Sequence, residues 1–215
     1  MEIIPYLKEI YGYDTPIFLK DIKIRKKSKA AIKQEFYRAN KRGDINREAN
    51  GIYYFKSDKE FGSGIRFNEL IEKKYVRDNM GFPGLEKVNV YGYYTGVTFL
   101  NQIHYSEQVP AVIEITTNNC KSNKRMIKLT GMMVVLRKPK TKITSVNYKT
   151  LQFLDMFRWM DIQELENEKT RDFLRKYIAS SSITKTQVND YIKLYSKETT
   201  QKLIVGKVYD SLLEQ

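Results

Sequence analysis

A basic stretch at residues 20–47 constrains the fold more than any other part of the sequence. It holds eleven of the 38 Lys and Arg residues against three acidic ones, and so carries +8 of the formal net charge of +13. Ser28 is a good helix N-cap, because its hydroxyl accepts a hydrogen bond from a first-turn amide, and Gly43 is a good C-terminal stop. The sequence therefore predicts a helix of about four turns between these two residues.

This predicted helix has two unlike faces. Ile32, Phe36 and Ala39 recur at i, i+4 and i+7 and form an apolar face. The opposite face is polar and mostly basic, and it consists of Lys33, Gln34, Tyr37, Arg38 and Lys41. We expect the first face to pack in a core and the second to face solvent or a polyanion.

A β-hairpin is predicted directly after the helix. Two short runs, residues 44–48 and 52–55, are joined through Asn50-Gly51, and the second run is rich in β-branched and aromatic residues. Asn-Gly favours a tight hairpin because both residue types tolerate positive φ. Helix followed by hairpin is the order of a winged helix.

Two helices are predicted before the basic one. Residues 1–12 have apolar residues at helical spacing, namely Ile3, Leu7 and Ile10. Residues 15–22 begin with Thr15-Pro16, which has the pattern of an N-cap followed by proline at the first helical position. Leu19 and Ile22 give this segment a short apolar stripe. It would be the first helix of a helix-turn-helix.

In a helix-turn-helix the second helix enters the major groove of DNA, where Lys and Arg side chains meet phosphates and Gln34 or Lys33 can read base edges. The alternative is that the basic face is only solvated. The DNA-binding hypothesis assigns contacts to Lys26, Lys27, Ser28, Lys29, Lys33, Gln34, Tyr37, Arg38, Lys41, Arg42, Arg47 and Asn50.

The length, composition and net charge of the chain limit the class of protein. The length of 215 residues suits one large domain or two small ones, and 41% hydrophobic residues suffice for a folded core. A net charge of +13 and a pI near 9.5 indicate a polyanionic partner, either nucleic acid or an anionic membrane surface. No apolar run approaches the roughly 18 residues that span a bilayer, and the start of the chain lacks the pattern of a signal peptide. We expect an unexported, cytoplasmic protein without a membrane partner.

The chain has one cysteine, Cys120, and one histidine, His104. A single cysteine excludes intrachain disulfides and cysteine-based zinc sites. His104 follows an apolar pattern, so a structural role is the simplest interpretation. The sequence indicates no cofactor and no metal.

The sequence predicts an α+β fold with three parts. Residues 1–57 form a winged helix-turn-helix DNA-binding domain, residues 58–87 are a connecting region with loop signals at 61–64 and 81–84, and residues 88–215 form a second domain. The connecting region also holds a short helical candidate at 68–74.

In the second domain we expect a small antiparallel or mixed sheet and several packed helices. A buried helix is predicted at residues 95–104, with Val97, Leu100 and His104 facing inward. Strands are predicted at 111–117, 125–129 and 132–137, the last two joined by Thr130-Gly131. Four amphipathic helical segments follow residue 150, and the last of them includes Leu203, Val205, Val208, Leu212 and Leu213.

A second concentration of basic charge lies at residues 121–142, which hold eight basic residues and no acidic one. It could be a further phosphate-contacting surface, a docking face for an acidic protein, or a solvated hairpin whose edge lysines deter aggregation. Its basic residues are Lys121, Lys124, Arg125, Lys128, Arg137, Lys138, Lys140 and Lys142.

Catalytic patterns are scarce, so we do not expect an enzyme. Residues 61–67 lack the Lys-Ser/Thr ending of a phosphate loop, and no Asp-x-Asp pair occurs that could hold Mg²⁺ beside Gly62-Ser63. Glu114 lies in a predicted strand, as in restriction-type nucleases, but Thr116 stands where that chemistry requires a lysine. A divergent nuclease that uses Glu114 remains a third alternative.

Three parts of the chain together resemble the AbiEi-type antitoxins, which are transcriptional-regulator partners in type IV toxin-antitoxin and abortive-infection systems. They are the basic helix with the R-x-x-x-G-I-Y pattern of residues 47–53, the block YYTGVTFLNQIHYSEQVPAVIEITT at 93–117, and the segment TLQFLDMFRWMD at 150–161. The 96–117 block is the most specific of these, because winged helices are common to many regulators.

The resemblance implies a winged helix that binds inverted repeats in its own promoter. It also implies a C-terminal domain that helps to neutralise a nucleotidyltransferase toxin, with or without a stable complex. The chain would then be an autorepressor and antitoxin. The alternative is a plain DNA-binding regulator whose C-terminal domain senses a ligand or dimerises.

Overall fold

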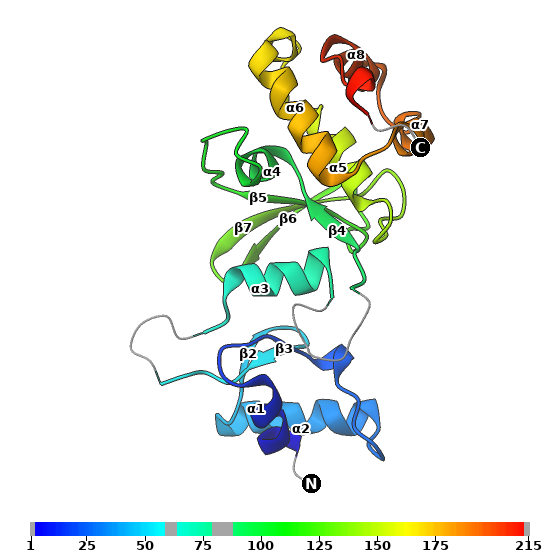
Figure 1. Ribbon diagram of the computed structural model, residues 1–215. Coiled ribbons are helices and arrows are strands. Elements are labelled where there is room, and N and C mark those ends of the chain that lie inside the picture. Colours follow the sequence, from blue (N-terminus) through cyan, green and yellow to red (C-terminus); the bar gives the residue numbers. More distant parts are fainter. Residues whose placement is uncertain (1–2, 59–63, 79–87, 213–215) are drawn as a thin grey trace. The chain divides into compact units, whose positions relative to one another are not determined.

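The computed structural model describes residues 3–58, 64–78 and 88–212. The chain divides into two compact units, Met1–Glu72 and Lys73–Gln215 (Figure 1). The described residues form eight α-helices and two small sheets, which is an α+β fold. Fourteen of the thirty residues of the predicted connecting region, including all of one loop signal and most of the other, lie outside the described residues.

The first unit contains one three-stranded antiparallel sheet with strand order β1-β3-β2. Its elements are α1 (Ile3–Tyr11), β1 (Ile17–Phe18), the 3-10 helix η1 (Leu19–Asp21), α2 (Lys29–Arg42), β2 (Asn46–Ala49), β3 (Ile52–Tyr54) and α3 (Phe67–Ile71). A π-helical turn, Glu72–Val76, follows α3 directly, so the two together cover the predicted helical candidate.

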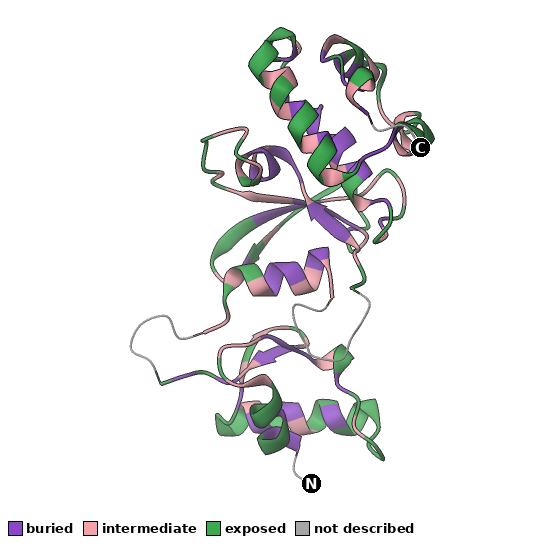
Figure 2. Cartoon of the chain, viewed as in Figure 1, coloured by how far each residue is buried: buried purple, intermediate pink, exposed green. Residues whose placement is uncertain are grey.

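Helix α2 has the ends and the inner face that the sequence predicts. The Ser28 side chain accepts a hydrogen bond of 3.2 Å from the backbone N–H of Ala31, and Gly43 ends the helix with φ +84°. Ile32, Phe36 and Ala39 are buried in the core of the first unit, and the opposite face is exposed (Figure 2).

The predicted hairpin is also confirmed. Strands β2 and β3 pair antiparallel, and Gly51 in the turn has φ +73°. The register shifts between Arg47 and Ala49, which is a β-bulge on the strand that leads into the turn.

The helix predicted at residues 15–22 is wrong. Ile17 and Phe18 instead form β1, which pairs with Tyr53 and Ile52 of β3. Both β1 side chains are buried, and a segment this short gains more from strand pairing and burial than from a helix that has only one or two turns to nucleate.

In α1 the buried residues are Ile3, Ile4 and Leu7, whereas Ile10 is 46% exposed. The prediction that Ile10 packs inward is therefore wrong. The buried residues of α1 all lie between Ile3 and Leu7.

Asp14 forms hydrogen bonds with the segment that follows β3. It has φ +57°, and its carboxylate accepts hydrogen bonds from the hydroxyl of Ser57, from the backbone N–H of Ser57 at 3.1 Å and from that of Gly64 at 2.8 Å. The backbone N–H of Asp14 in turn donates to the carbonyl of Phe55 at 2.7 Å. Segments before β1 and after β3 are thereby held together.

The second unit contains a mixed four-stranded sheet of order β4-β5-β7-β6, in which β5 and β7 are parallel. Its first elements are β4 (Gly92–Tyr94), α4 (Gly96–Gln102), β5 (Ile113–Thr117), β6 (Lys124–Leu129), β7 (Met132–Arg137) and α5 (Tyr148–Met156). The three predicted strands are confirmed. Strand β4 was not predicted, because its three residues have no alternating pattern of their own.

Helices follow the sheet to the end of the described chain, and α4 to α8 lie on one side of the sheet (Figure 1). They are, with two 3-10 helices, η3 (Glu164–Glu166), α6 (Glu168–Ser181), α7 (Lys185–Ile192), α8 (Lys197–Val205) and η4 (Tyr209–Ser211). The last predicted helix is too long, since α8 ends at Val205. Its last predicted residue, Leu213, lies outside the described residues.

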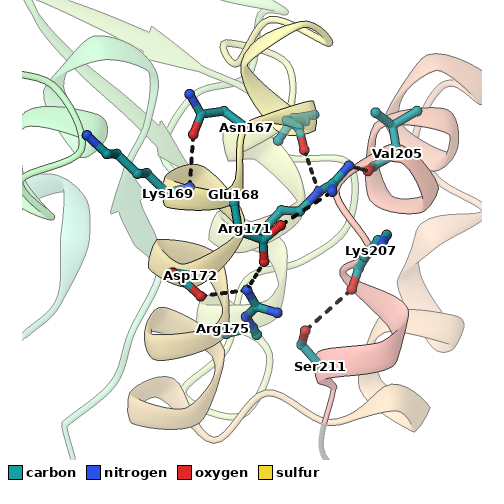
Figure 3. Close-up of polar contacts among 10 residues, drawn as sticks. Asn167, Glu168, Lys169, Arg171, Asp172, Arg175, Val205, Lys207 and Ser211 are labelled. Carbon is teal, nitrogen blue, oxygen red and sulfur yellow. Dashed lines mark hydrogen bonds and ion pairs between the residues drawn. The ribbon is translucent and has the colours of Figure 1, made fainter.

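Arg171 joins three of these helical segments. Its guanidinium donates to the carbonyl of Leu165 in η3 and to that of Val205 in α8, both at 3.0 Å (Figure 3). Arg175 lies one turn after Arg171 in α6 and is exposed. Its guanidinium forms ion pairs with Glu168 and Asp172 (Figure 3). Arg171 therefore connects α6 to both η3 and α8.

His104 does not point into a core. It lies beyond the end of α4, is exposed and has φ +59°. The prediction of an inward histidine is wrong because α4 ends two residues earlier, at Gln102. In the described part of the chain, no helix has both the length and the apolar character needed to cross a bilayer.

Candidate nucleic-acid interface

Glu35, the one acidic residue of α2, ties the basic helix to its surroundings. Its Oε2 atom lies 2.9 Å from Nζ of Lys27, in the turn before α2. Its Oε1 atom accepts a hydrogen bond of 3.2 Å from the backbone N–H of Ile3, at the start of α1. Sequence reasoning gave Glu35 no role, although a single carboxylate in a basic helix was a usable signal.

All twelve residues predicted to contact DNA are exposed, so the structure brings them to the surface of α2, its preceding turn and the hairpin. Five of these side chains have no hydrogen-bond or ion-pair partner among the described residues: Lys26, Lys29, Lys33, Gln34 and Arg38. These groups are available to an external anion without the loss of an internal contact.

Other side chains of the same surface are braced by neighbours. Arg42 lies 2.8 Å from the carboxylate of Asp44, and Nζ of Lys41 lies 5.1 Å from the centre of the Tyr37 ring. Both contacts are exposed, so they orient the cations at little energetic cost to an incoming ligand.

Arg47 forms hydrogen bonds within the β2–β3 hairpin. Arg47 donates to the carbonyl of Ala49 at 3.3 Å and to the side-chain oxygen of Asn50 at 3.1 Å. Arg47 is thus held against the turn, where it adds a positive charge to the tip of the hairpin.

The exposed side of α2 has two rows at i, i+4, i+8 spacing. One row is Lys33, Tyr37 and Lys41, and the other is Gln34, Arg38 and Arg42. The second row lines a groove of about 930 Å³ between α1 and α2. Gln34 and Lys41 both lie nearly opposite the buried face of the helix.

Arg137 was predicted to belong to the second basic surface, and this prediction is wrong. This side chain is only 18% exposed, and its Nε and Nη2 atoms each lie 3.0 Å from Oε2 of Glu114. Its guanidinium carbon lies 5.3 Å from the centre of the Trp159 ring. Arg137 is therefore part of a half-buried contact between β5, β7 and the segment after α5, and is not free to meet a partner.

The other seven residues of the second basic surface are exposed, but strand alternation divides them. Lys124 and Lys128 lie on one face of β6, and Arg125 lies on the opposite face. Lys121, Lys138, Lys140 and Lys142 lie in the loops at the end of the sheet where β6 begins and β7 ends.

Glu114, on which the nuclease alternative depends, pairs with Arg137 and lies beside Gly96, where an added Cβ atom would come within 3.0 Å of its Oε2. The described residues contain no group of three His, Cys, Asp or Glu side chains placed to hold a metal ion. The geometry around Glu114 is that of a packed ion pair.

A buried polar network in the second unit was not predicted. Asp155 of α5 accepts hydrogen bonds from the Tyr93 hydroxyl at 3.0 Å and from the Thr116 hydroxyl at 3.2 Å, and so joins α5 to β4 and β5. Burial raises the pKa of Asp155, and the nearby Arg158 partly opposes this shift. Burial also raises the pKa of Tyr93. The sequence offered one signal, an aspartate within the apolar run of residues 151–157.

Compared with models of protein families, with curated proteins and with solved structures, the chain matches none. The relation to AbiEi-type antitoxins therefore remains a prediction from the residues quoted above.

Proposed function

We propose that this protein is a DNA-binding transcriptional repressor whose first unit is a winged helix-turn-helix with α2 as the helix that enters the major groove. The observation that carries the proposal is the outer side of α2. It presents Lys33, Gln34 and Arg38, whose side chains have no hydrogen-bond or ion-pair partner among the described residues, on a helix whose other side is packed in a core. Cations for phosphates and an amide for a base edge are the groups that such recognition requires.

The order of elements supports the same proposal. A winged helix has a strand between its first two helical segments, and this strand pairs with the second strand of the hairpin. Here β1 pairs with β3, β3 pairs with β2, and α2 precedes the hairpin. The short helix η1 takes the position of the second helical segment.

The test is the salt dependence of duplex binding by the full chain. Each phosphate that a lysine neutralises releases a condensed counterion, so the slope of log K against log salt is about −0.9 per contact. Replacing Lys33 and Lys41 with alanine should weaken binding to every sequence and reduce the slope by about 1.8.

A matched control removes the same charge from another helix. Lys169 and Lys176 are exposed lysines of α6, and their replacement by alanine should leave the affinity and the slope nearly unchanged. Equal losses in both double variants would mean that binding follows net charge alone, and the proposal for α2 would then be wrong.

We also propose, from the family resemblance, that the protein acts as the antitoxin of a type IV system and that its operator is an inverted repeat in its own promoter. The partner would be a nucleotidyltransferase toxin encoded beside it, counteracted with or without a stable complex. Support comes from the quoted residues of the 93–117 block, which form β4, α4 and β5 of the second unit.

Co-expression with the neighbouring gene tests the antitoxin proposal. The full chain should restore growth of cells that express this gene, and the Lys33→Ala/Lys41→Ala variant should still do so while losing operator binding. If the neighbouring gene is harmless, the plain regulator remains and the antitoxin proposal is withdrawn.

A further inference from the structure

One face of the β6–β7 hairpin is only partly covered by the rest of its unit. The register pairs Lys124 with Arg137, Met126 with Val135 and Lys128 with Met133, so these six side chains share one face of the sheet. Because β5 pairs with β7, Glu114 belongs to the same face.

The cover on this face reaches Val135 and Arg137 of β7, but it does not reach Met133 or the residues of β6. Val135 is 3% exposed and the Arg137 side chain 18% exposed, whereas their direct partners Met126 and Lys124 are exposed. Trp159, which follows α5, lies against Arg137 and is part of this cover. Strand β6 is an edge strand of the described sheet, so it projects beyond the covered part.

The uncovered area combines apolar and cationic groups. Met126 is 56% and Met133 36% exposed, and Lys124 and Lys128 lie on either side of Met126 along β6. We call these four residues the Met/Lys face. Exposed methionines adapt their shape to a partner, and exposed apolar groups bordered by charges are typical of protein interaction sites.

The positive charges of Lys124 and Lys128 favour some classes of binding partner over others. A second copy of the chain in a symmetric dimer would bring Lys124 and Lys128 toward lysines of the same surface, which is unfavourable. Surfaces for single-stranded nucleic acid use aromatic side chains to stack bases, and the Met/Lys face has none. A protein segment with carboxylates beside an apolar side chain complements the face.

We propose that the Met/Lys face docks an extended acidic segment of a partner protein. An apolar side chain of that segment contacts Met126 and Met133, and carboxylates two residues before and two residues after it pair with Lys124 and Lys128. This spacing follows from the period of two residues along β6. The proposal does not depend on DNA binding by α2.

The probe is a fluorescein-labelled peptide that repeats Glu-Ser-Leu-Ser and ends with one further glutamate, so that every leucine has glutamates two residues away on both sides. Fluorescence anisotropy measures its binding to the full chain. Two control peptides replace leucine by serine, which keeps the charge, or glutamate by lysine, which reverses it. A labelled DNA duplex is measured in parallel.

The chain offers matched control positions on the opposite face of the same hairpin. Met126→Gln/Met133→Gln and Lys124→Gln/Lys128→Gln alter the Met/Lys face. Met132→Gln and Arg125→Gln alter exposed residues whose side chains lie on the other face. All six positions are exposed, and thermal melting checks that each variant folds.

We expect each double variant to bind the peptide about tenfold more weakly than the unaltered chain, and both control variants to bind it equally well. The serine and lysine peptides should bind poorly, and duplex affinity should not change in any variant. The proposal is wrong if the peptide does not bind, if both faces matter equally, if the serine peptide binds as well, or if the double variants lose duplex binding instead.

Discussion

The Glu35 carboxylate holds the Lys27 ammonium group at 2.9 Å. This contact connects the middle of α2 to the turn before it, and it withdraws one cation from the surface that we assign to DNA. Both side chains are about one third exposed, so the pair adds little to stability. Its main effect is on the charge that a duplex meets.

Replacing Glu35 with glutamine should therefore strengthen duplex binding. The amide oxygen can still accept the hydrogen bond from Ile3, while Lys27 becomes free to contact a phosphate. We expect the salt slope to increase by about 0.9, the value of one added contact. Titrations at several salt concentrations measure it, and weaker binding would instead mean that the pair positions α2.

Gln34 is expected to read a base. Its side chain is exposed on α2 and has no hydrogen-bond partner in the described part of the chain, and a paired hydrogen bond to an adenine edge contributes about 1 to 3 kcal/mol of discrimination. Gln34→Ala should reduce the preference among operator variants more than it lowers binding to random DNA. Lys33→Ala is the control, since a phosphate contact should be lost equally on all sequences.

Replacing Glu114 with alanine should destabilise the second unit by about 2 kcal/mol, because Arg137 would remain half-buried without its partner. Urea unfolding measures the loss. Asp172→Ala breaks an exposed ion pair with Arg175 and should leave stability nearly unchanged. Similar losses in the two variants would show that burial of the Glu114 pair is not what matters.

The Glu114→Ala variant also tests whether Glu114 acts in a nuclease or has only a structural role. If the unaltered protein nicks DNA in the presence of Mg²⁺ and Glu114→Ala abolishes nicking without unfolding the chain, a divergent nuclease is established. We expect no nicking by either protein.

The buried Asp155 should make stability depend on pH. Burial raises its pKa in the folded state, so between the unfolded value near 3.8 and the raised value the folded state binds more protons than the unfolded state. Stability from this group therefore decreases as pH rises through that window and stays constant above it. Asp155→Asn lacks the charge, so its stability relative to the unaltered protein should improve from acidic to neutral pH.

Urea unfolding at several pH values measures this difference. Asp190→Asn, at an exposed position of α7, is the control and should show no such trend. A stability difference that is independent of pH would mean that Asp155 titrates as it does in the unfolded chain.

Elements with local signals could be predicted from the sequence. Ser28 and Gly43 set the ends of α2 through cap chemistry, and Thr130-Gly131 sets the β6–β7 turn, where φ is +45° and +82°. Each of these depends on neighbours within a few residues, which the sequence displays directly.

Elements created by distant pairing could not be predicted in this way. Strand β1 exists because β3 pairs with it across more than thirty residues, and its own sequence has the pattern of a helix start. An arginine is usually expected at the surface, but Arg137 is partly buried by Glu114 and Trp159, which belong to other segments of the chain. Such positions depend on the packing of whole units.

The hydrogen bonds of Asp14 have a consequence for synthesis on the ribosome. Its partners in Phe55, Ser57 and Gly64 all precede the second unit, so every one of these bonds can form once Gly64 has emerged from the exit tunnel. Chains usually fold domain by domain from the N-terminus during translation. The basic helix α2 can therefore be assembled on a nascent chain before the second unit is complete.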